Sequence, residues 1–317
     1  MSEINYFSKD IVGGKAANLG ELSNIDFSNR ALVPEDAFAV PFYYYYMHIK
    51  ASGAKPLIDS ICQNEQNLSQ KSLSIKLKRL RNLIVEQPLD HHFLNTLNRK
   101  VSNNFGTDRV RFRSSTNAED VKGFNGAGLY KSKTGQIGNK SKSIEKAVKA
   151  VWASLWFERA FHERDRFKLN QEELCLGILV HKAFGKEQAN GVALTKNIYR
   201  EDYPGFLISV QVDEESVASP KNGVICDHFI TYSPFDFKDK NRGSLVEWIS
   251  KSNLNKGLPV LTTEEIENLT LALASIKEHY YKILKGDYSK YYELAIDVEF
   301  KYSKENRKLY IKQARIL

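Results

Sequence analysis

The sequence Glu-Leu-Ala-Ile-Asp-Val-Glu-Phe (293–300) is followed, after a short polar loop, by Lys-Leu-Tyr-Ile-Lys-Gln-Ala-Arg (308–315). Both runs alternate apolar and polar residues, as a β-strand with one buried face does. The loop between them spans residues 303–307 and is short enough to join two antiparallel strands. The pattern therefore predicts a β-hairpin at this end of the sequence.

The polar face of this hairpin contains the most informative side chains. Because side chains alternate along a strand, Asp297 and Glu299 project from one face, and Gln313 and Arg315 share a face of the returning strand. Two adjacent carboxylates repel each other unless a cation neutralises them, and hard oxygen ligands suit Mg²⁺. The Arg and Gln would then meet the phosphate oxygens that the metal bridges. Alternating charges are equally typical of a solvated face, which Lys301 continues, so spacing alone leaves both interpretations open.

A second cluster combines arginines with small polar residues. Val-Arg-Phe-Arg-Ser-Ser-Thr-Asn-Ala-Glu-Asp (110–120) precedes Gly-Phe-Asn-Gly-Ala-Gly (123–128), which predicts a short strand that ends in a glycine-rich loop. Arginine recognises phosphate in a bidentate manner, and backbone amides of such a loop can bind the same anion. Arg113 is therefore a candidate phosphate ligand, although a lone glycine-rich loop can also be an ordinary tight turn.

A third cluster, Gly13-Gly14-Lys15, precedes apolar residues at helical spacing. A Gly-Gly turn that opens a helix with a lysine in its first turn suits an anion, because the helix dipole and the ammonium act together. The spacing differs from the Walker motif, so the segment is not a P-loop.

Helices and strands are mixed along the whole chain, which predicts the α+β class. Thr262 and Glu265 form a capping box that opens a helix running to Gly286. Two further amphipathic helices are predicted over residues 72–86 and from Ser143 to about Arg166. Runs rich in β-formers lie between the helices, at residues 176–183, 191–195, 206–212 and 225–232.

The composition is that of a globular protein without a membrane segment. The chain has 317 residues, 42% of them hydrophobic, which is enough for a sizeable core. No export signal or run of about 20 apolar residues is present, and the three cysteines are isolated, so we expect a soluble cytoplasmic protein. The net charge of +8 raises a nucleic-acid alternative. The basic runs have no interleaved aromatic residues, so a nucleic-acid partner is disfavoured and an anionic ligand is preferred.

Four motifs together resemble a known family. Gly-Gly-Lys-Ala-Ala-Asn-Leu-Gly-Glu-Leu (13–22), Arg-Ser-Ser-Thr-Asn-Ala-Glu-Asp (113–120), Gly-Val-Ala-Leu-Thr (191–195) and Asp-Val-Glu-Phe with Gln-Ala-Arg (297–300, 313–315) occur in the order of the ATP-binding region of phosphoenolpyruvate synthase and pyruvate phosphate dikinase. Glucan water dikinase is similar. The resemblance implies an ATP-grasp fold, with lobes at residues 1–178 and 179–317 and the nucleotide in the cleft between them.

The same resemblance assigns roles to single residues. It implies ATP and Mg²⁺ as ligands, with Asp297 and Glu299 organising the metal. The side chains that it places on the nucleotide are Lys15 and Arg113 at the phosphates, Thr195 lining the cleft, Glu214 near the ribose or adenine, and Gln313 and Arg315 completing the site from the last strand.

The phosphoryl acceptor is expected elsewhere. Similar dikinases pass a phosphoryl group to a histidine in a Thr-x-x-Gly-Gly-x-x-x-His motif, and none of the seven histidines here has those neighbours. We therefore expect a phosphohistidine-carrier domain or a separate acceptor protein as partner. The alternative is a non-catalytic nucleotide-sensing or partner-binding module on the same scaffold.

Overall fold

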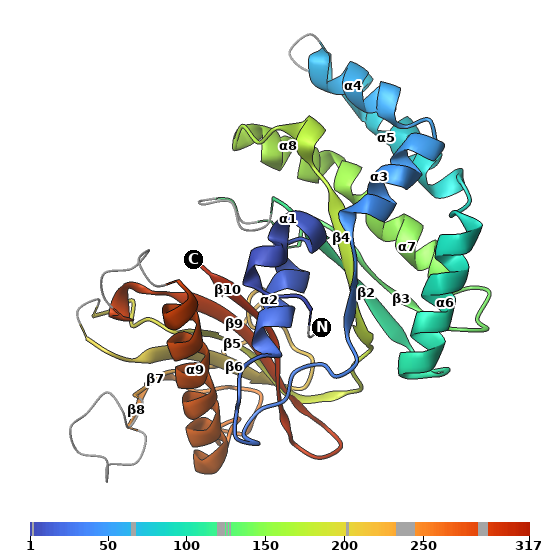
Figure 1. Ribbon diagram of the computed structural model, residues 1–317. Coiled ribbons are helices and arrows are strands. Elements are labelled where there is room, and N and C mark those ends of the chain that lie inside the picture. Colours follow the sequence, from blue (N-terminus) through green and yellow to red (C-terminus); the bar gives the residue numbers. More distant parts are fainter. Residues whose placement is uncertain are drawn as a thin grey trace. The chain divides into compact units, whose positions relative to one another are not determined.

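The chain divides into two compact units (Figure 1). Unit 1 comprises residues 1–20 and 35–183, and unit 2 comprises residues 21–34 and 184–317. None of the described helices is long and apolar enough to cross a bilayer. The computed structural model describes every residue except Ser2, 65–67, 119–123, Asn125, Ala127, 201–202, 233–244 and 285–290.

In its described residues, unit 1 contains an antiparallel sheet in the order β1-β4-β2-β3, together with several helices. The predicted helix over 72–86 is present as α5, and the predicted strand at 176–183 is present as β4. The elements are η1 (Tyr6–Ser8), α1 (Lys9–Val12), α2 (Gly14–Leu22, whose last two residues belong to unit 2), β1 (Phe38–Val40), α3 (Phe42–Ala51), α4 (Lys55–Gln63), α5 (Gln70–Glu86), α6 (His91–Phe105), β2 (Val110–Thr116), β3 (Ser132–Gly135), α7 (Ile144–Ala153), η3 (Ser154–Trp156), α8 (Glu158–Arg166), η4 (Gln171–Glu173) and β4 (Leu176–Lys182).

The prediction of a single helix from Ser143 to about Arg166 is wrong in one respect. Ser143 caps the start as expected, because its side chain accepts a hydrogen bond from the Lys146 amide. The helix then breaks after Ala153. The Ser154 hydroxyl donates to the Val151 carbonyl (2.6 Å) and accepts from the Lys131 amide (3.0 Å), so this side chain competes for backbone groups of the helix. Phe157 is extended, and α8 begins only after it.

Unit 2 contains, in its described residues, an antiparallel sheet in the order β10-β9-β5-β6-β7-β8. The predicted hairpin is confirmed as β9 and β10, and the predicted strands at 191–195, 206–212 and 225–232 correspond to β5, β6 and β7. The elements are β5 (Glu187–Leu194), β6 (Phe206–Val212), β7 (Asp227–Thr231), β8 (Val246–Ser250), α9 (Thr263–Ile283), η6 (Tyr291–Glu293), β9 (Ile296–Ser303) and β10 (Leu309–Ile316).

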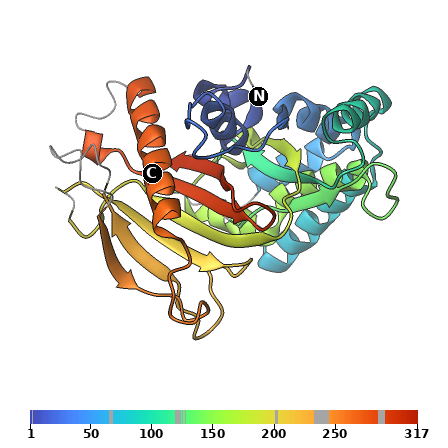
Figure 2. The ribbon, with the colours of Figure 1, turned by 90° about the horizontal axis from the view of Figure 1, so that it is seen from below.

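The two faces of this sheet differ in character. Ile296, Val298 and Phe300 of β9 are almost completely buried on the face that helix α9 covers, as Figure 2 shows for the orange helix beside the red strands. Side-chain contacts of α9 with the sheet extend to β7, where the Thr231 and Thr270 hydroxyls are 2.7 Å apart. The opposite face, which contains Asp297 and Glu299, is called the polar face below.

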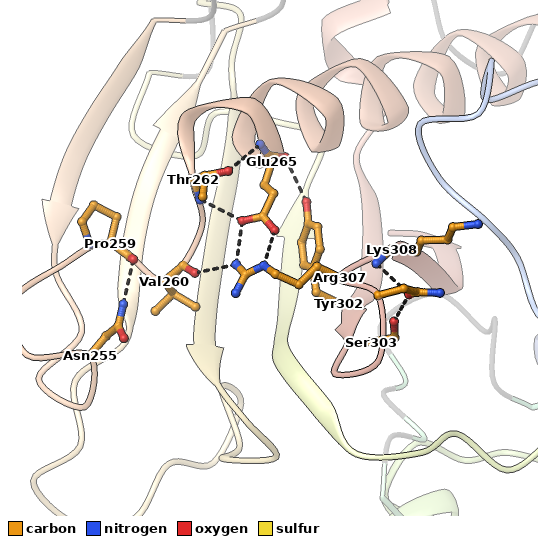
Figure 3. Close-up of polar contacts among 10 residues, drawn as sticks. Asn255, Pro259, Val260, Thr262, Glu265, Tyr302, Ser303, Arg307 and Lys308 are labelled. Carbon is orange, nitrogen blue, oxygen red and sulfur yellow. Dashed lines mark hydrogen bonds and ion pairs between the residues drawn. The ribbon is translucent and has the colours of Figure 1, made fainter.

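A hydrogen-bond network fixes the start of α9 to the β9–β10 hairpin (Figure 3). The predicted capping box is confirmed, with the Thr262 amide donating to Glu265 (2.8 Å) and the Glu265 amide donating to the Thr262 hydroxyl (3.2 Å). The guanidinium of Arg307, in the hairpin turn, donates two 2.7 Å bonds to the Glu265 carboxylate. Tyr302 of β9 donates to the Glu265 carbonyl (2.9 Å). The network therefore holds the hairpin against the helix. The Gly286 end predicted for this helix lies outside the described residues.

Candidate functional site

Unit 1 brings the Gly-Gly-Lys segment against the end of strand β2. Gly13 has φ = 81°, in the region that favours glycine, and a Cβ there would lie 2.4 Å from the carbonyl carbon and oxygen of Ser115. The Ala16 amide, in the first turn of α2, donates to the Ser115 hydroxyl (3.0 Å). Lys15 is therefore presented from a helix start that rests on the strand of Arg113.

The face of β2 that contains Arg113 is strongly basic. Arg111, Arg113 and Ser115 alternate with buried Val110 and Phe112, so they share one face. Burial and the neighbouring Arg113 and Arg109 lower the pKa of the Arg111 guanidinium. Adjacent cations on a half-buried strand favour an anionic ligand. The sequence pattern predicted Arg113 as a phosphate ligand, and the structure adds Arg111 as a second cation of this face.

Part of the glycine-rich loop predicted after β2 lies outside the described residues, namely residues 119–123, Asn125 and Ala127. Glu119 and Asp120 of the second motif are among them. Before the loop, Asn117 fixes the strand end, because its amide group donates to the Glu173 carbonyl and accepts from the Cys175 amide.

In unit 2, the hairpin places four predicted site residues together on the polar face. Glu299 is directly opposite Gln313, and Asp297 is directly opposite Arg315. Arg315 Nη2 donates to Asp297 Oδ2 at 2.9 Å. Burial raises the pKa of the Asp297 carboxyl, Arg315 opposes the shift, and the charge of Glu299 adds to it. The predicted juxtaposition of Asp297, Glu299, Gln313 and Arg315 is thus present.

Lys301 differs from the expectation of a solvated residue. It is only 1% exposed, although it continues the face of Asp297 and Glu299. Its ammonium lies 3.6 Å from the centre of the Phe184 ring and 3.7 Å from Glu187 Oε1. Burial lowers the pKa of Lys301 to about 8, with Glu187 opposing the shift. The polar face is therefore partly enclosed at this end, and Lys301 and Glu187 are residues that alternation alone could not have identified.

Thr195 is fully buried at the end of β5. Its amide donates to the Ile296 carbonyl (2.9 Å), and its hydroxyl accepts from the Ile296 amide (3.0 Å). The buried ammonium of Lys277, from α9, donates to the Thr195 carbonyl. These contacts anchor the strand end beside Asp297, which is paired with the preceding Leu194.

Glu214 is exposed in the turn after β6, and its charge acts on the Lys301 ammonium. Asp213 has φ = 55°, a left-handed conformation that Asp tolerates better than most residues. The Asn190 side chain donates to the carbonyls of Asp213 (2.7 Å) and Glu215 (2.9 Å), so it holds the turn. Leu194 of β5 is directly opposite Asp297. Asn190 lies four residues before Leu194, a distance of about 14 Å along the strand. The structure thus places Glu214 near the opposite end of β5 from Asp297.

The donor set of the polar face suits a magnesium ion that is shared with phosphates. Across the part of the chain that the structure describes, no group of three or more His, Cys, Asp or Glu side chains is arranged to hold a metal. Mg²⁺ commonly uses one or two carboxylates and completes its shell with water and phosphate oxygens. Asp297 and Glu299 fit that chemistry and do not fit a fully protein-ligated site.

The sequence matches a family model described as "Pyruvate phosphate dikinase, AMP/ATP-binding domain" over residues 9–317. The chain belongs to this family. The predicted resemblance is therefore confirmed, and so is the mixed α+β class with two sheets.

Similar proteins include phosphoenolpyruvate synthases and a rifampicin phosphotransferase. A probable phosphoenolpyruvate synthase of Methanocaldococcus jannaschii is 27% identical over 99% of this chain and 26% of its own length. The phosphoenolpyruvate synthase of Pyrococcus furiosus is 24% identical over 99% of this chain and 42% of its own length. A rifampicin phosphotransferase of Bacillus cereus is 31% identical over 61% of this chain and 24% of its own length. The pyruvate phosphate dikinase AMP/ATP-binding domain described here thus spans less than half of these relatives.

Proposed function

We propose that this chain is the nucleotide-binding part of an ATP-dependent phosphotransferase, which passes a phosphoryl group from ATP to a histidine or another acceptor on a separate domain or protein. The observation that supports it most is the pairing of Asp297 with Arg315 and of Glu299 with Gln313 on one sheet face, in a chain that the AMP/ATP-binding family model matches almost completely. A two-lobe division at residues 1–178 and 179–317 and a cytoplasmic location are parts of the same proposal.

The proposed phosphate ligands come from both units. In unit 1, Lys15 at the start of α2 and Arg113 on β2 would bind phosphate oxygens, Arg113 in a bidentate manner. In unit 2, Arg315 and Gln313 would do the same from β10. Arg315 bonds Asp297 in the structure, and a phosphate would replace that carboxylate as its partner. Catalysis of this type consists mostly of positioning and charge neutralisation.

The proposed metal ligands are Asp297 and Glu299. A magnesium ion held there would neutralise charge on the phosphate oxygens during transfer. Burial and the charge of Glu299 both raise the pKa of Asp297, because they disfavour its charged form. A bound cation would stabilise the charged carboxylates, which favours binding of the metal together with the nucleotide. Thr195 would keep the strand end in place, and Glu214 would meet the ribose or adenine from the other end of β5.

The proposal is tested by incubating the chain with ATP labelled at the β or γ position and Mg²⁺, alone and with cell extract. We expect label to appear on a protein or a small molecule. The variants Lys15→Ala and Arg113→Ala should abolish this transfer. Magnesium-dependent ATP binding without transfer to anything would favour the nucleotide-sensing module instead.

A further inference from the structure

Strand β10 contains a bulge beside the proposed metal ligands. Ile311 is opposite Phe300, and Gln313 is opposite Glu299, so two steps on β10 correspond to one step on β9 and Lys312 is the additional residue. In a regular strand, Lys312 would project to the face opposite Gln313. Bulges are common near active sites, where they redirect a side chain. Tyr310 is opposite Lys301 and Gln313 is opposite Glu299, so the bulge lets Lys312 and Gln313 lie on the same face.

The ion pairs show that Lys312 projects from the polar face. Its Nζ lies 3.9 Å from Glu187 Oε1, the same oxygen that lies 3.7 Å from Lys301 Nζ. Lys301 shares its face with Glu299, because the two residues are two positions apart on β9. Lys312 is therefore a cation next to Gln313 on the face of the carboxylate pair, which the alternation of the sequence could not reveal.

Glu187 does not need Lys312 for its own charge balance. The Lys301 ammonium is buried against the Glu187 carboxylate, so Glu187 keeps a cationic partner when Lys312 turns away. The side chain of Lys312 is 23% exposed and that of Glu187 is 16% exposed, whereas Lys301 is 1% exposed. Lys312 is thus the accessible one of the two cations that contact Glu187.

We propose that Lys312 is a further phosphate-binding residue of the polar face and that Glu187, held by Lys301, positions its ammonium beside Gln313 and Glu299. The inference rests on the proposed function, because it assumes that the nucleotide phosphates lie at this face. A lysine ammonium is a compact charge that can turn from the long Glu187 contact to a phosphate oxygen without leaving a buried carboxylate unpaired.

The test measures the affinity of the 317-residue chain for MgATP and for adenosine by calorimetric titration. Lys312→Met should weaken MgATP about tenfold, as loss of one charge-assisted hydrogen bond does, and should leave adenosine within about twofold. Lys312→Arg should restore most of the MgATP affinity. The matched control is Lys308→Met, which removes the same charge from the exposed hairpin turn and should bind MgATP like the wild type.

The positioning role of Glu187 has its own readout. Glu187→Gln should weaken MgATP binding in the wild-type background and weaken it no further in Lys312→Met, because its effect on the phosphates passes through that lysine. The loss of its contact with the buried Lys301 should appear separately, as a lower free energy of unfolding in both backgrounds. Lys312→Gln provides a second variant if Lys312→Met does not fold.

Two outcomes are distinguishable. A wild-type chain that does not bind MgATP would overturn the proposed function and the inference together. Wild-type binding with unchanged affinity in Lys312→Met, or an equal loss for MgATP and adenosine, would overturn the inference alone.

Discussion

Strand β2 in unit 1 and strand β9 in unit 2 each present alternating charged residues on one face, yet the two faces have opposite chemistry. The β2 face contains Arg111 and Arg113, and burial together with the neighbouring arginines lowers the pKa of Arg111. The β9 face contains Asp297 and Glu299, and burial together with Glu299 raises the pKa of Asp297. In the proposed function, the β2 face would bind phosphate directly, whereas the carboxylates of β9 would need a cation between them and a phosphate. The same strand pattern would then provide two different ways to bind one kind of ligand.

The largest effect is expected at the face that needs a metal. Glu299→Gln keeps the shape of the side chain but removes a metal ligand, so phosphoryl transfer from ATP should fall on the order of 100-fold or more. Transfer of labelled phosphate at saturating Mg²⁺ measures it, with Glu293→Gln, which lies outside strand β9, as a control. A transfer rate within about fivefold of the wild type would mean that this face does not organise the metal.

The next effect concerns the helix start that rests on β2. Gly13→Ala would place a methyl group 2.4 Å from the Ser115 carbonyl and would strain a backbone with positive φ. We expect a loss of about 2 kcal/mol or more in the free energy of unfolding, because the obstacle is backbone that cannot move aside. Urea denaturation measures it, and Gly53→Ala is the control, since φ is also positive there but open space surrounds it. Equal losses in the two variants would show that the contact with Ser115 is unimportant.

The basic face should respond without a requirement for magnesium. Arg113→Met should weaken ATP about 10-fold to 50-fold both with and without Mg²⁺, because the guanidinium would contact phosphate directly. Calorimetric titration of ATP in EDTA and in Mg²⁺ provides the comparison, and Arg109→Met, at the residue before the same strand, is the control. If the loss appears only in Mg²⁺, the distinction between the two faces is wrong.

The smallest effect is expected in the network that holds the hairpin. Burial raises the pKa of the Glu265 carboxyl, but the bonds from Arg307 and the Thr262 amide outweigh it, so the pKa lies below its ordinary value. The stability that this pairing adds is therefore present above the unfolded pKa of about 4.3 and is lost as the pH falls through the folded pKa. Glu265→Gln should cost about 1 kcal/mol at pH 7 and less at pH 3. Urea denaturation at both pH values measures it, and a loss independent of pH would contradict the electrostatic origin.

Much of unit 2 could be predicted from the sequence because its signals are local. The hairpin, the shared face of Asp297 and Glu299 and the Thr262 capping box follow from alternation and from contacts between residues close in the chain. The residue patterns indicated anion binding by Lys15 and Arg113 and metal binding by the carboxylate pair, and the family resemblance gave these residues their roles toward ATP. The roles of Thr195 and Glu214 came from the resemblance alone, and all of these roles stay predictions.

What the sequence could not show depends on contacts between distant segments. The burial of Lys301 results from Phe184 and Glu187, which lie more than a hundred residues earlier in the chain. The bulge at Lys312 changes the face of one side chain by adding a residue to the strand pairing. The break after Ala153 depends on the bond between Ser154 and the Lys131 amide. In each case a periodic pattern is interrupted by a tertiary contact.

The most direct test of the account is the effect of magnesium on ATP binding. Calorimetric titration of ATP should show at least about tenfold tighter binding in Mg²⁺ than in EDTA for the wild-type chain, and the double variant Asp297→Asn, Glu299→Gln should lose that difference. ATP affinity that does not respond to magnesium in the wild type, or a magnesium effect that persists in the double variant, would contradict the assignment of the polar face as the metal and phosphate site.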